Sequence, residues 1–219
     1  VSRDWSSDVC SSDLPPPLRS HSDYCGLPSN SARQWDQVAL GTALMRFLLE
    51  MMYYCSLAGA CGFLEHPAFP VWAMKHSPAS TWTLTAVRRL RRLNCVSIAT
   101  FDQCIFHCEG KKPTTLLLVR LPHLREALLK LGRGGRCPHA SGAHTALKGR
   151  GPDGSFRTSV AKVYPPQMNA AIAEAVIHFA CATFVPGEQQ SAVPECVAQH
   201  ARMDFVPLSV VQPDYYEGL

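Results

Sequence analysis

Two groups of cysteines and histidines, about thirty residues apart, offer side chains of the kind that bind zinc. The first group is Cys104, His107 and Cys108, and the second is Cys137, His139 and His144. Thiolate sulfur and imidazole nitrogen are the usual zinc ligands, and a structural site takes four of them. The paired Cys-x-x-Cys spacing of a strong zinc signature is not present. One interpretation is a zinc site that joins the groups, with Cys104, Cys108, Cys137, His139 and His144 as candidate ligands. The other is buried cysteines and surface histidines.

A short apolar stretch that ends in an acidic residue is the second chemical feature. Residues 62–67, with the sequence GFLEHP, follow a long apolar segment. They predict a buried strand that delivers Glu65 to a turn, and α/β enzymes often place catalytic groups near strand ends. A strand-end glutamate that faces solvent would give the same pattern, so the stretch does not by itself specify a reaction.

The charge distribution is uneven. The formal net charge is only +4, but residues 88–162 contain fifteen Lys/Arg against four Asp/Glu. A basic middle segment suits a polyanion, so nucleic acid is the expected partner, and ordinary solvated surface charge is the alternative. The candidate contacts are Arg88, Arg89, Arg91, Arg92, Lys111 and Lys112.

The composition predicts one core and a reducing compartment. The chain has 219 residues, of which 47% are hydrophobic, enough for one globular domain. Ten cysteines could indicate a disulfide scaffold, but several lie in apolar runs and no signal peptide is visible. The apolar run 51–64 is too short to span a bilayer, and Arg46 and Glu50 interrupt its extension. We therefore expect an intracellular protein, cytoplasmic or nuclear, without a membrane span.

Four segments are expected along the chain. Residues 4–14 look like the translation of a sequencing-library adapter, so 1–14 are excluded from the analysis of fold and function, and the true N-terminus is expected to be missing. The Pro/Ser-rich segment 15–30 predicts a disordered or extended lead-in. Residues 31–184 form the α/β domain, in which 132–155 is a long basic loop rich in Gly and His. Residues 185–219 form an acidic, Pro-containing tail.

Hydrophobic periodicity and turn signals predict the elements that must position these groups. A capping-box spacing at Ser31 starts a helix with an apolar stripe that ends near Gly59. Further helices are expected over 81–92, from Pro122 to about 131, and from Pro165. Strands are expected over 62–65, 95–101 and 114–119. This order of helices and strands favours an α/β fold.

Three of these stretches, in this order, resemble motifs of cytosine-5 DNA methyltransferases. Residues 62–67 resemble the Glu-Asn-Val strand end, although His66 stands where the family has Asn. Residues 100–114 are similar to the later strand–loop–strand, and 163–173 look like the final Val-Pro-Pro helix. Together they cover about residues 41–182, the second half of such a domain. The resemblance implies a partial Rossmann-like sheet with flanking helices, incomplete at its N-terminus, with a mobile element or phage as its source.

The resemblance also implies roles for individual residues. Glu65 would hydrogen-bond the Watson–Crick edge of an extruded cytosine. Tyr164, Pro165 and Asn169 would lie beside the methyl donor, S-adenosylmethionine. Lys111 and Lys112 would contact phosphate, although the family's Gln-x-Arg-x-Arg pattern does not occur.

Two parts that methyl transfer needs are not found in the sequence. The reaction requires a thiolate nucleophile, which the family places in a Pro-Cys loop, and no Pro-Cys dipeptide occurs. The Gly-rich segment 131–135 follows a helix, so it does not serve as the loop that binds S-adenosylmethionine. We therefore expect a catalytically incomplete remnant or fragment that binds nucleic acid through 88–162. It would be a methyltransferase only with a missing N-terminal half. The alternatives are a zinc-stabilised binding or scaffold module without enzymatic activity, and a non-functional translated transcript.

Overall fold

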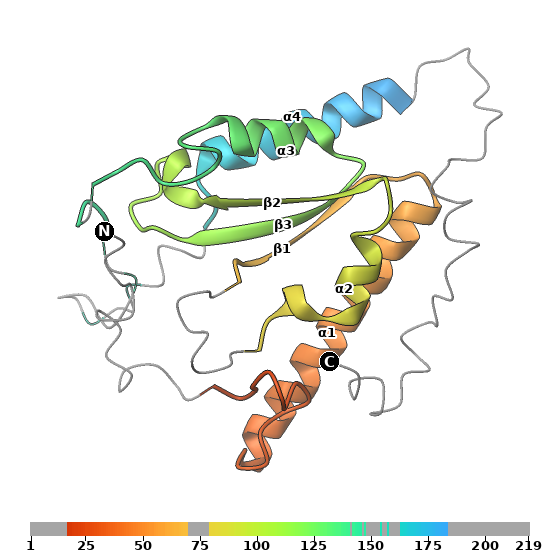
Figure 1. Ribbon diagram of the computed structural model, residues 1–219, viewed down its shortest axis with the longest axis vertical. Coiled ribbons are helices and arrows are strands. Elements are labelled where there is room, and N and C mark those ends of the chain that lie inside the picture. The colour runs from red at the N-terminus through yellow and green to blue at the C-terminus, as the bar shows by residue number, and fades with distance from the viewer. Residues whose placement is uncertain are drawn as a thin grey trace.

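The computed structural model of the chain describes residues 17–69, 79–140, 142–145, 147, 154, 157 and 163–183. The expectations for the adapter-like start, for the acidic tail and for most of 148–162 lie outside these residues. Within them, three strands form one small sheet with helices on both faces, as Figure 1 shows. The α/β class that the sequence predicted is confirmed at this level.

The sheet is antiparallel, with the last strand in its centre. Its strands are β1 (Gly62–Pro67), β2 (Val96–Asp102) and β3 (Pro113–Val119), in the order β1-β3-β2. Both outer strands run antiparallel to β3, with Glu65 opposite Leu116 and Asp102 opposite Pro113. The neighbouring strands of a Rossmann-like sheet are mostly parallel, so a Rossmann-like fold is not confirmed by these three. β1 and β2 are parallel to each other across β3.

Helices cover both faces of this sheet (Figure 1). One face packs on α1 (Ala32–Leu57) and α2 (Thr85–Leu90), in a core built around Leu49, Val87, Leu90 and Leu117. The other face packs on α3 (Pro122–Lys130) and α4 (Pro166–Thr183), in a core that includes Phe101, Leu116, Leu118, Leu124, Leu128 and Met168. Successive strand residues point to opposite faces, so each strand contributes to both cores.

Most predicted boundaries are close to the observed ones, and the second helix is the main exception. The sequence predicted one helix over 81–92, but the chain forms the 3-10 helix η3 (Thr81–Thr83) and then the short α2. Leu84 separates them with an extended backbone, at φ −59° and ψ 137°. Trp82 is buried and its indole N–H donates to the Pro67 carbonyl at 2.7 Å. We infer that this anchor to β1 sets the break between the two helices.

Only part of the predicted apolar stripe on α1 faces the core. The capping box forms, because the Ser31 N–H donates to Gln34 Oε1 at 2.7 Å. Leu49 and Met52 are buried against the sheet, whereas Leu44 is 55% and Phe47 58% exposed. The helix is apolar around most of its circumference, so spacing alone did not reveal which side packs.

The same helix passes the length and composition test for a membrane span. Among the residues described, α1 alone does so, with a mean hydropathy of 1.2 over an 18-residue window, of which 17% is buried. The expectation of no span had treated Arg46 and Glu50 as interruptions. A single such helix is weak evidence for a span, because core helices of soluble proteins pass the same test.

Candidate metal centre

Four side chains converge at the end of β2 and form what we call the metal cluster: Cys104, Cys137, His139 and His144. One ligand atom from each lies within 4.8 Å of the other three. Cys137 Sγ is 3.3 Å from His139 Nδ1 and 3.0 Å from His144 Nε2. Cys104 is buried, His139 is exposed and the other two are half-buried. The cluster is therefore anchored in the protein on one side and open to solvent on the other.

The sheet and a short helix position Cys104. β2 ends at Asp102, and the 3-10 helix η4 (Gln103–Phe106) follows at once. Phe101 and Phe106 bracket this turn and contact each other edge to face in the core. Gln103 is buried, and its side-chain amide donates to Thr114 Oγ1 at 3.0 Å. These contacts hold the Cys104 thiol, which is only 3% exposed, at a fixed place on the rigid end of the sheet.

A glycine-rich turn brings Cys137 to the same place. The Gly135 N–H donates to the Leu131 carbonyl, and the Arg133 N–H donates to the Arg136 carbonyl. Gly135 has φ 83°, and a Cβ there would lie 3.1 Å from both Phe101 Cβ and the Thr100 carbonyl oxygen. Glycine is needed because the backbone is left-handed and lies directly against β2. Residues 131–135 thus have a structural role, which is to present Cys137.

Asp102 ties the two halves of the metal cluster together. Its carboxylate Oδ2 accepts the N–H of Cys137 at 2.9 Å, and its own N–H donates to the Gly135 carbonyl at 2.9 Å. The Asp102 side chain is buried, and Lys111 Nζ lies 3.9 Å from Oδ2. Farther along, the Thr145 N–H donates to the Glu109 carbonyl at 3.2 Å, which holds the segment that carries His144. Such outer contacts orient the ligands of metal sites.

The environment of Cys104 favours the protonated thiol when no cation is bound. Burial, together with the neighbouring Cys137 thiol and the Asp102 carboxylate, raises the pKa of the Cys104 thiol to about 12. A divalent cation would supply the charge that stabilises a thiolate there, so metal binding would release protons and strengthen with rising pH.

The donor set matches zinc better than other common ions. Two sulfurs and two imidazole nitrogens form the Cys2His2 combination of structural zinc sites, whereas Mg²⁺ and Ca²⁺ prefer oxygen. The eight described cysteines are all free thiols, so no disulfide competes among them. Cys108, also predicted as a ligand, is not in the cluster. It follows His107, whose left-handed backbone (φ 65°) turns the chain after η4.

Glu65 lies in a second group of polar residues, which we call the acid cluster: Glu65, Lys112 and Tyr164. Lys112 Nζ is 3.8 Å from Glu65 Oε1 and 5.6 Å from the centre of the Tyr164 ring. Burial, and then the charge and hydrogen bond of Glu65, raise the pKa of Tyr164 to about 12. Glu65 Oε1 is buried and has no hydrogen-bond partner among the described residues. Three of the candidate site residues, Glu65, Lys112 and Tyr164, therefore lie close together.

The residues predicted to lie beside S-adenosylmethionine make local contacts at the start of α4. Pro165 is buried, and its carbonyl accepts the Asn169 N–H at 3.1 Å. The Asn169 side-chain amide donates to the Tyr164 carbonyl at 3.5 Å, and Asn169 itself is exposed. These contacts begin the helix and turn Tyr164 towards Glu65. They do not distinguish a cofactor site from an ordinary helix start.

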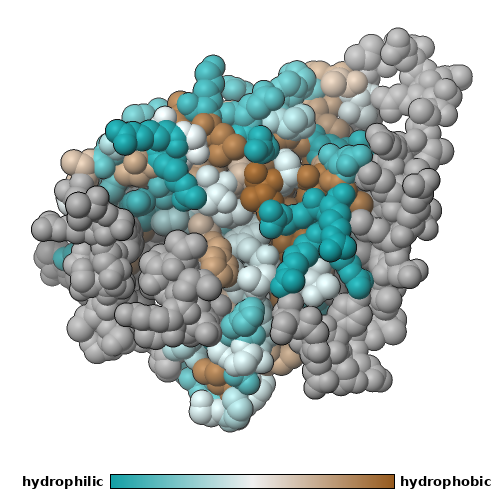
Figure 2. All heavy atoms as spheres, viewed as in Figure 1, coloured by the Kyte–Doolittle hydropathy of each residue, from teal (hydrophilic) through white to brown (hydrophobic). Residues whose placement is uncertain are grey.

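The six predicted nucleic-acid contacts do not form one surface. Arg88, Arg89, Arg91 and Arg92 are on or just after α2, near the start of β2, and we call them the α2 arginines. Figure 2 shows a hydrophilic patch over this helix. Lys111 and Lys112 precede β3, at the opposite end of the sheet, and lie beside carboxylates.

The sequence analysis missed two features of the metal cluster. Asp102 was given no role, because the predicted strand ended at Phe101, and the glycines before Cys137 were placed in the long loop 132–155 and rejected as a cofactor loop. The signal that could have identified both is a Gly-rich turn that ends two residues before Cys-x-His, together with an acid two residues before Cys104. No family model, curated protein or solved structure matches this chain.

Proposed function

We propose that this chain is a zinc-stabilised binding module without enzymatic activity of its own. The observation that carries this proposal is the convergence of four soft ligand atoms within 4.8 Å, from two segments more than thirty residues apart. Four protein ligands complete a tetrahedral zinc shell, which leaves no position for a catalytic water. The ion would act as a cross-link between η4 and the Gly-rich loop. That loop contributes little to either hydrophobic core, so the zinc would supply the stabilisation that burial does not.

Metal analysis of the purified chain tests this proposal. We expect one zinc per chain after dialysis against metal-free buffer, and none in the double variant Cys137→Ser, His139→Ala. Cys108→Ser is the matched control, because it removes a nearby thiol outside the cluster and should retain the metal. Retention of zinc by the double variant, or absence of zinc from the unaltered chain under reducing conditions, would contradict the proposal.

The partner that we propose for this module is nucleic acid, bound through the α2 arginines. Arg88, Arg91 and Arg92 are exposed, and Arg89 is half-buried. A short helix that displays several arginines can contact successive phosphates, and such contacts weaken steeply with salt because counterions are released. Lys111 and Lys112 are left out of this proposal, since both lie beside carboxylates of the protein.

Salt-dependent DNA retention tests the nucleic-acid partner. Binding should fall as ionic strength rises, and Arg91→Gln with Arg92→Gln should reduce the logarithmic salt slope by about two. Arg133→Gln with Arg136→Gln is a matched control, since it removes the same charge from an exposed turn far from α2. Equal losses in both pairs would show a general charge effect instead of a site on α2.

A second candidate is descent from a cytosine-5 methyltransferase domain, and the acid cluster favours it. Glu65 lies beside Lys112 and Tyr164, the residues that the resemblance assigns to contacts with phosphate and with the methyl donor. β1 and β2 run parallel on either side of β3, and α2 lies in the crossover between them, so the sheet is compatible with a piece of a larger Rossmann-like sheet. Because the thiol loop and cofactor loop are not found, we expect no methyl incorporation into DNA by this chain alone. Incorporation from labelled S-adenosylmethionine would contradict that expectation.

A further inference from the structure

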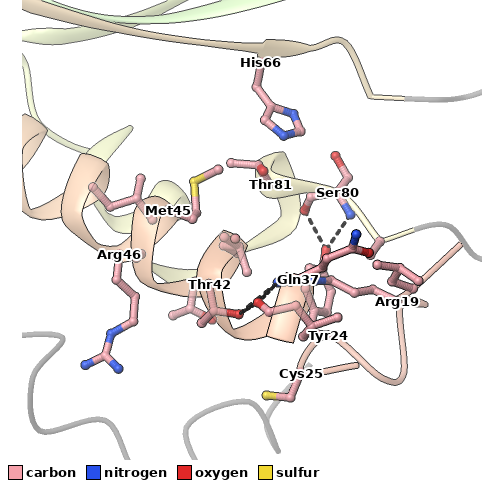
Figure 3. A pocket seen from close by; sticks show the side chains of 18 residues that line it. Arg19, Tyr24, Cys25, Gln37, Thr42, Met45, Arg46, His66, Ser80 and Thr81 are labelled. Carbon is pink, nitrogen blue, oxygen red and sulfur yellow. Dashed lines mark hydrogen bonds between the residues drawn. The ribbon is translucent and has the colours of Figure 1, made fainter. Parts of the chain in front are cut away.

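A cavity of about 380 Å³ lies on the α1 side of the sheet, away from both polar clusters. Its walls come from α1, from residues 18–25 and from the start of η3 and α2, and His66 closes it from the sheet side (Figure 3). The segment 18–25, expected to be a lead-in without structure, is anchored here, because the buried Tyr24 hydroxyl hydrogen-bonds Ser80. The volume is in the range of small-molecule sites, about 300–1,000 Å³. We call it the α1 cavity.

His66 supplies an unused polar group to this cavity. Adjacent strand residues point to opposite faces, so Glu65 joins the acid cluster while His66 points into the α1 cavity, as Figure 3 shows. His66 Nδ1 is buried and has no hydrogen-bond partner among the described residues. Burial lowers the pKa of His66, so the ring is neutral at pH 7 and can donate or accept one hydrogen bond. Because Nδ1 is not accessible to water, a ligand in the cavity would reach the ring through its other nitrogen, Nε2.

Arg19 supplies a fixed positive charge on the other side of the cavity. Its Nη2 donates to the Val38 carbonyl at 2.6 Å and to Thr42 Oγ1 at 2.9 Å, which holds the guanidinium against α1. Gly41 gives it room, because a Cβ there would lie 3.4 Å from Nη2. The guanidinium has five N–H donors, and these two bonds leave Nε and Nη1 for other acceptors. Among the described residues that line the cavity there is no Asp or Glu, so these residues disfavour a cation.

Between these two groups the lining is largely apolar. Met45, Leu49 and Leu84 lie along it, and the Met45 thioether points into the same space as the His66 ring (Figure 3). The Met45 sulfur and the His66 imidazole together favour an aromatic ring in the ligand, since thioethers pack well against the edges and faces of aromatic rings. We propose that the α1 cavity binds a small aromatic carboxylic acid, with its carboxylate on Arg19 and a hydroxyl group at the far end of its ring on His66. This proposal is independent of zinc and of nucleic acid.

Three matched probes separate the two polar contacts. 4-Hydroxyphenylacetate carries both groups, phenylacetate omits the hydroxyl, and 4-hydroxyphenylacetamide omits the charge. Calorimetric titration of the purified full chain should give submillimolar binding of the first. The amide should bind about ten- to a hundredfold more weakly, and phenylacetate up to about tenfold more weakly, from the usual strengths of charged and neutral hydrogen bonds. Equal binding of all three, or no binding of the first, would overturn the proposal.

Substitutions of residues that line the α1 cavity test whether the probes bind there. Arg19→Gln should weaken 4-hydroxyphenylacetate but leave the amide unchanged, and His66→Phe should remove the difference between 4-hydroxyphenylacetate and phenylacetate. Arg46→Gln is the matched control for charge, because Arg46 also lines the cavity but its guanidinium group extends away from His66 and Arg19 in Figure 3. Ala79→Phe, which fills the cavity from its rim, should abolish binding of all three probes. An unchanged midpoint of thermal unfolding in each variant verifies the fold. Equal losses in Arg19→Gln and Arg46→Gln would mean general electrostatics and overturn the site.

Discussion

The metal cluster and the acid cluster lie at the same end of the sheet but differ in how they satisfy their own charges. Two consecutive lysines before β3 each lie beside a carboxylate of one cluster. Lys111 Nζ is 3.9 Å from Asp102 Oδ2, next to the metal cluster, and Lys112 Nζ is 3.8 Å from Glu65 Oε1 in the acid cluster. In the acid cluster, the Glu65 carboxylate lies beside the Lys112 ammonium and hydrogen-bonds Tyr164, although its Oε1 has no hydrogen-bond partner among the described residues. In the metal cluster, four ligand atoms crowd together, and none of the four side chains carries a fixed positive charge.

The metal cluster contains no fixed positive charge that would stabilise its thiols as thiolates, so a bound cation would stabilise it. In the acid cluster, the Lys112 ammonium already offsets the charge of the Glu65 carboxylate. Two thiols and two imidazoles within 4.8 Å gain little from one another, because thiols are weak hydrogen-bond partners. A cation would replace these weak contacts with four coordinate bonds. The acid cluster gains less from a ligand, because a substrate would first have to compete with Lys112 and Tyr164 for Glu65. We therefore expect removal of the metal ligands to have larger consequences than removal of the charged pair.

The largest expected effect is loss of the buried ligand. Cys104→Ala should abolish stoichiometric zinc binding and lower the free energy of unfolding by about 4 kcal/mol, when free zinc is about a thousand times the dissociation constant. Thermal unfolding with and without a chelator measures this loss, and the chelator should have no effect on the variant. Cys108→Ala is the control. A Cys104–Cys137 disulfide that persists under reducing conditions with zinc present would remove the basis of the comparison.

A smaller effect is expected from the residue that orients the loop. Asp102→Ala removes the acceptor for the Cys137 N–H, and outer contacts of this kind change metal affinity by about ten- to a hundredfold. Competition with a chromophoric chelator measures the zinc affinity. Asp102→Asn keeps an acceptor oxygen and should lose less. If both variants bind zinc as tightly as the unaltered chain, the loop is positioned by other contacts.

A still smaller effect is expected in the acid cluster. Both Glu65 and Lys112 remain partly exposed, with side-chain exposures of 19% and 24%, so solvent weakens their attraction. A double-mutant cycle with Glu65→Gln and Lys112→Met should give a coupling energy of about 1 kcal/mol in urea unfolding. If Glu65→Gln instead stabilises the protein and removes binding to single-stranded DNA, the acid cluster is a strained functional site. The conclusion that the acid cluster gains less from a ligand than the metal cluster does would then be wrong.

The sequence predicted the elements better than their arrangement. The strands and the last two helices were predicted because β-branched runs, prolines and glycines mark their ends locally. The placement of β3 between β1 and β2 depends on contacts between distant residues, which no local pattern encodes. For the same reason the core-facing side of α1 was not identified, since most of its circumference is apolar.

In the candidate sites, too, the features marked by local sequence were predicted, and those that depend on contacts between distant residues were not. Four of the five predicted ligands come together, because cysteine and histidine are recognisable by chemistry alone. The exclusion of Cys108 depends on the left-handed turn at His107, and the role of Asp102 depends on where the Gly-rich turn docks. The α1 cavity could not be predicted, because it is formed by segments that are up to about seventy residues apart.

The smallest effect concerns the titration of Tyr164. Its folded-state pKa, raised to about 12 by burial and Glu65, lies above the ordinary value of 10.0. The unfolded chain therefore loses this proton first as pH rises. The contribution to stability is complete below pH 10 and declines between about 10 and 12. At about pH 11, NMR of ring-labelled tyrosine should show Tyr164 still protonated. Glu65→Gln removes the neighbouring charge and should shift its midpoint towards 10, although burial should keep part of the shift. An unchanged midpoint would mean that burial alone raises the pKa, and that the carboxylate and hydroxyl are not coupled in the acid cluster.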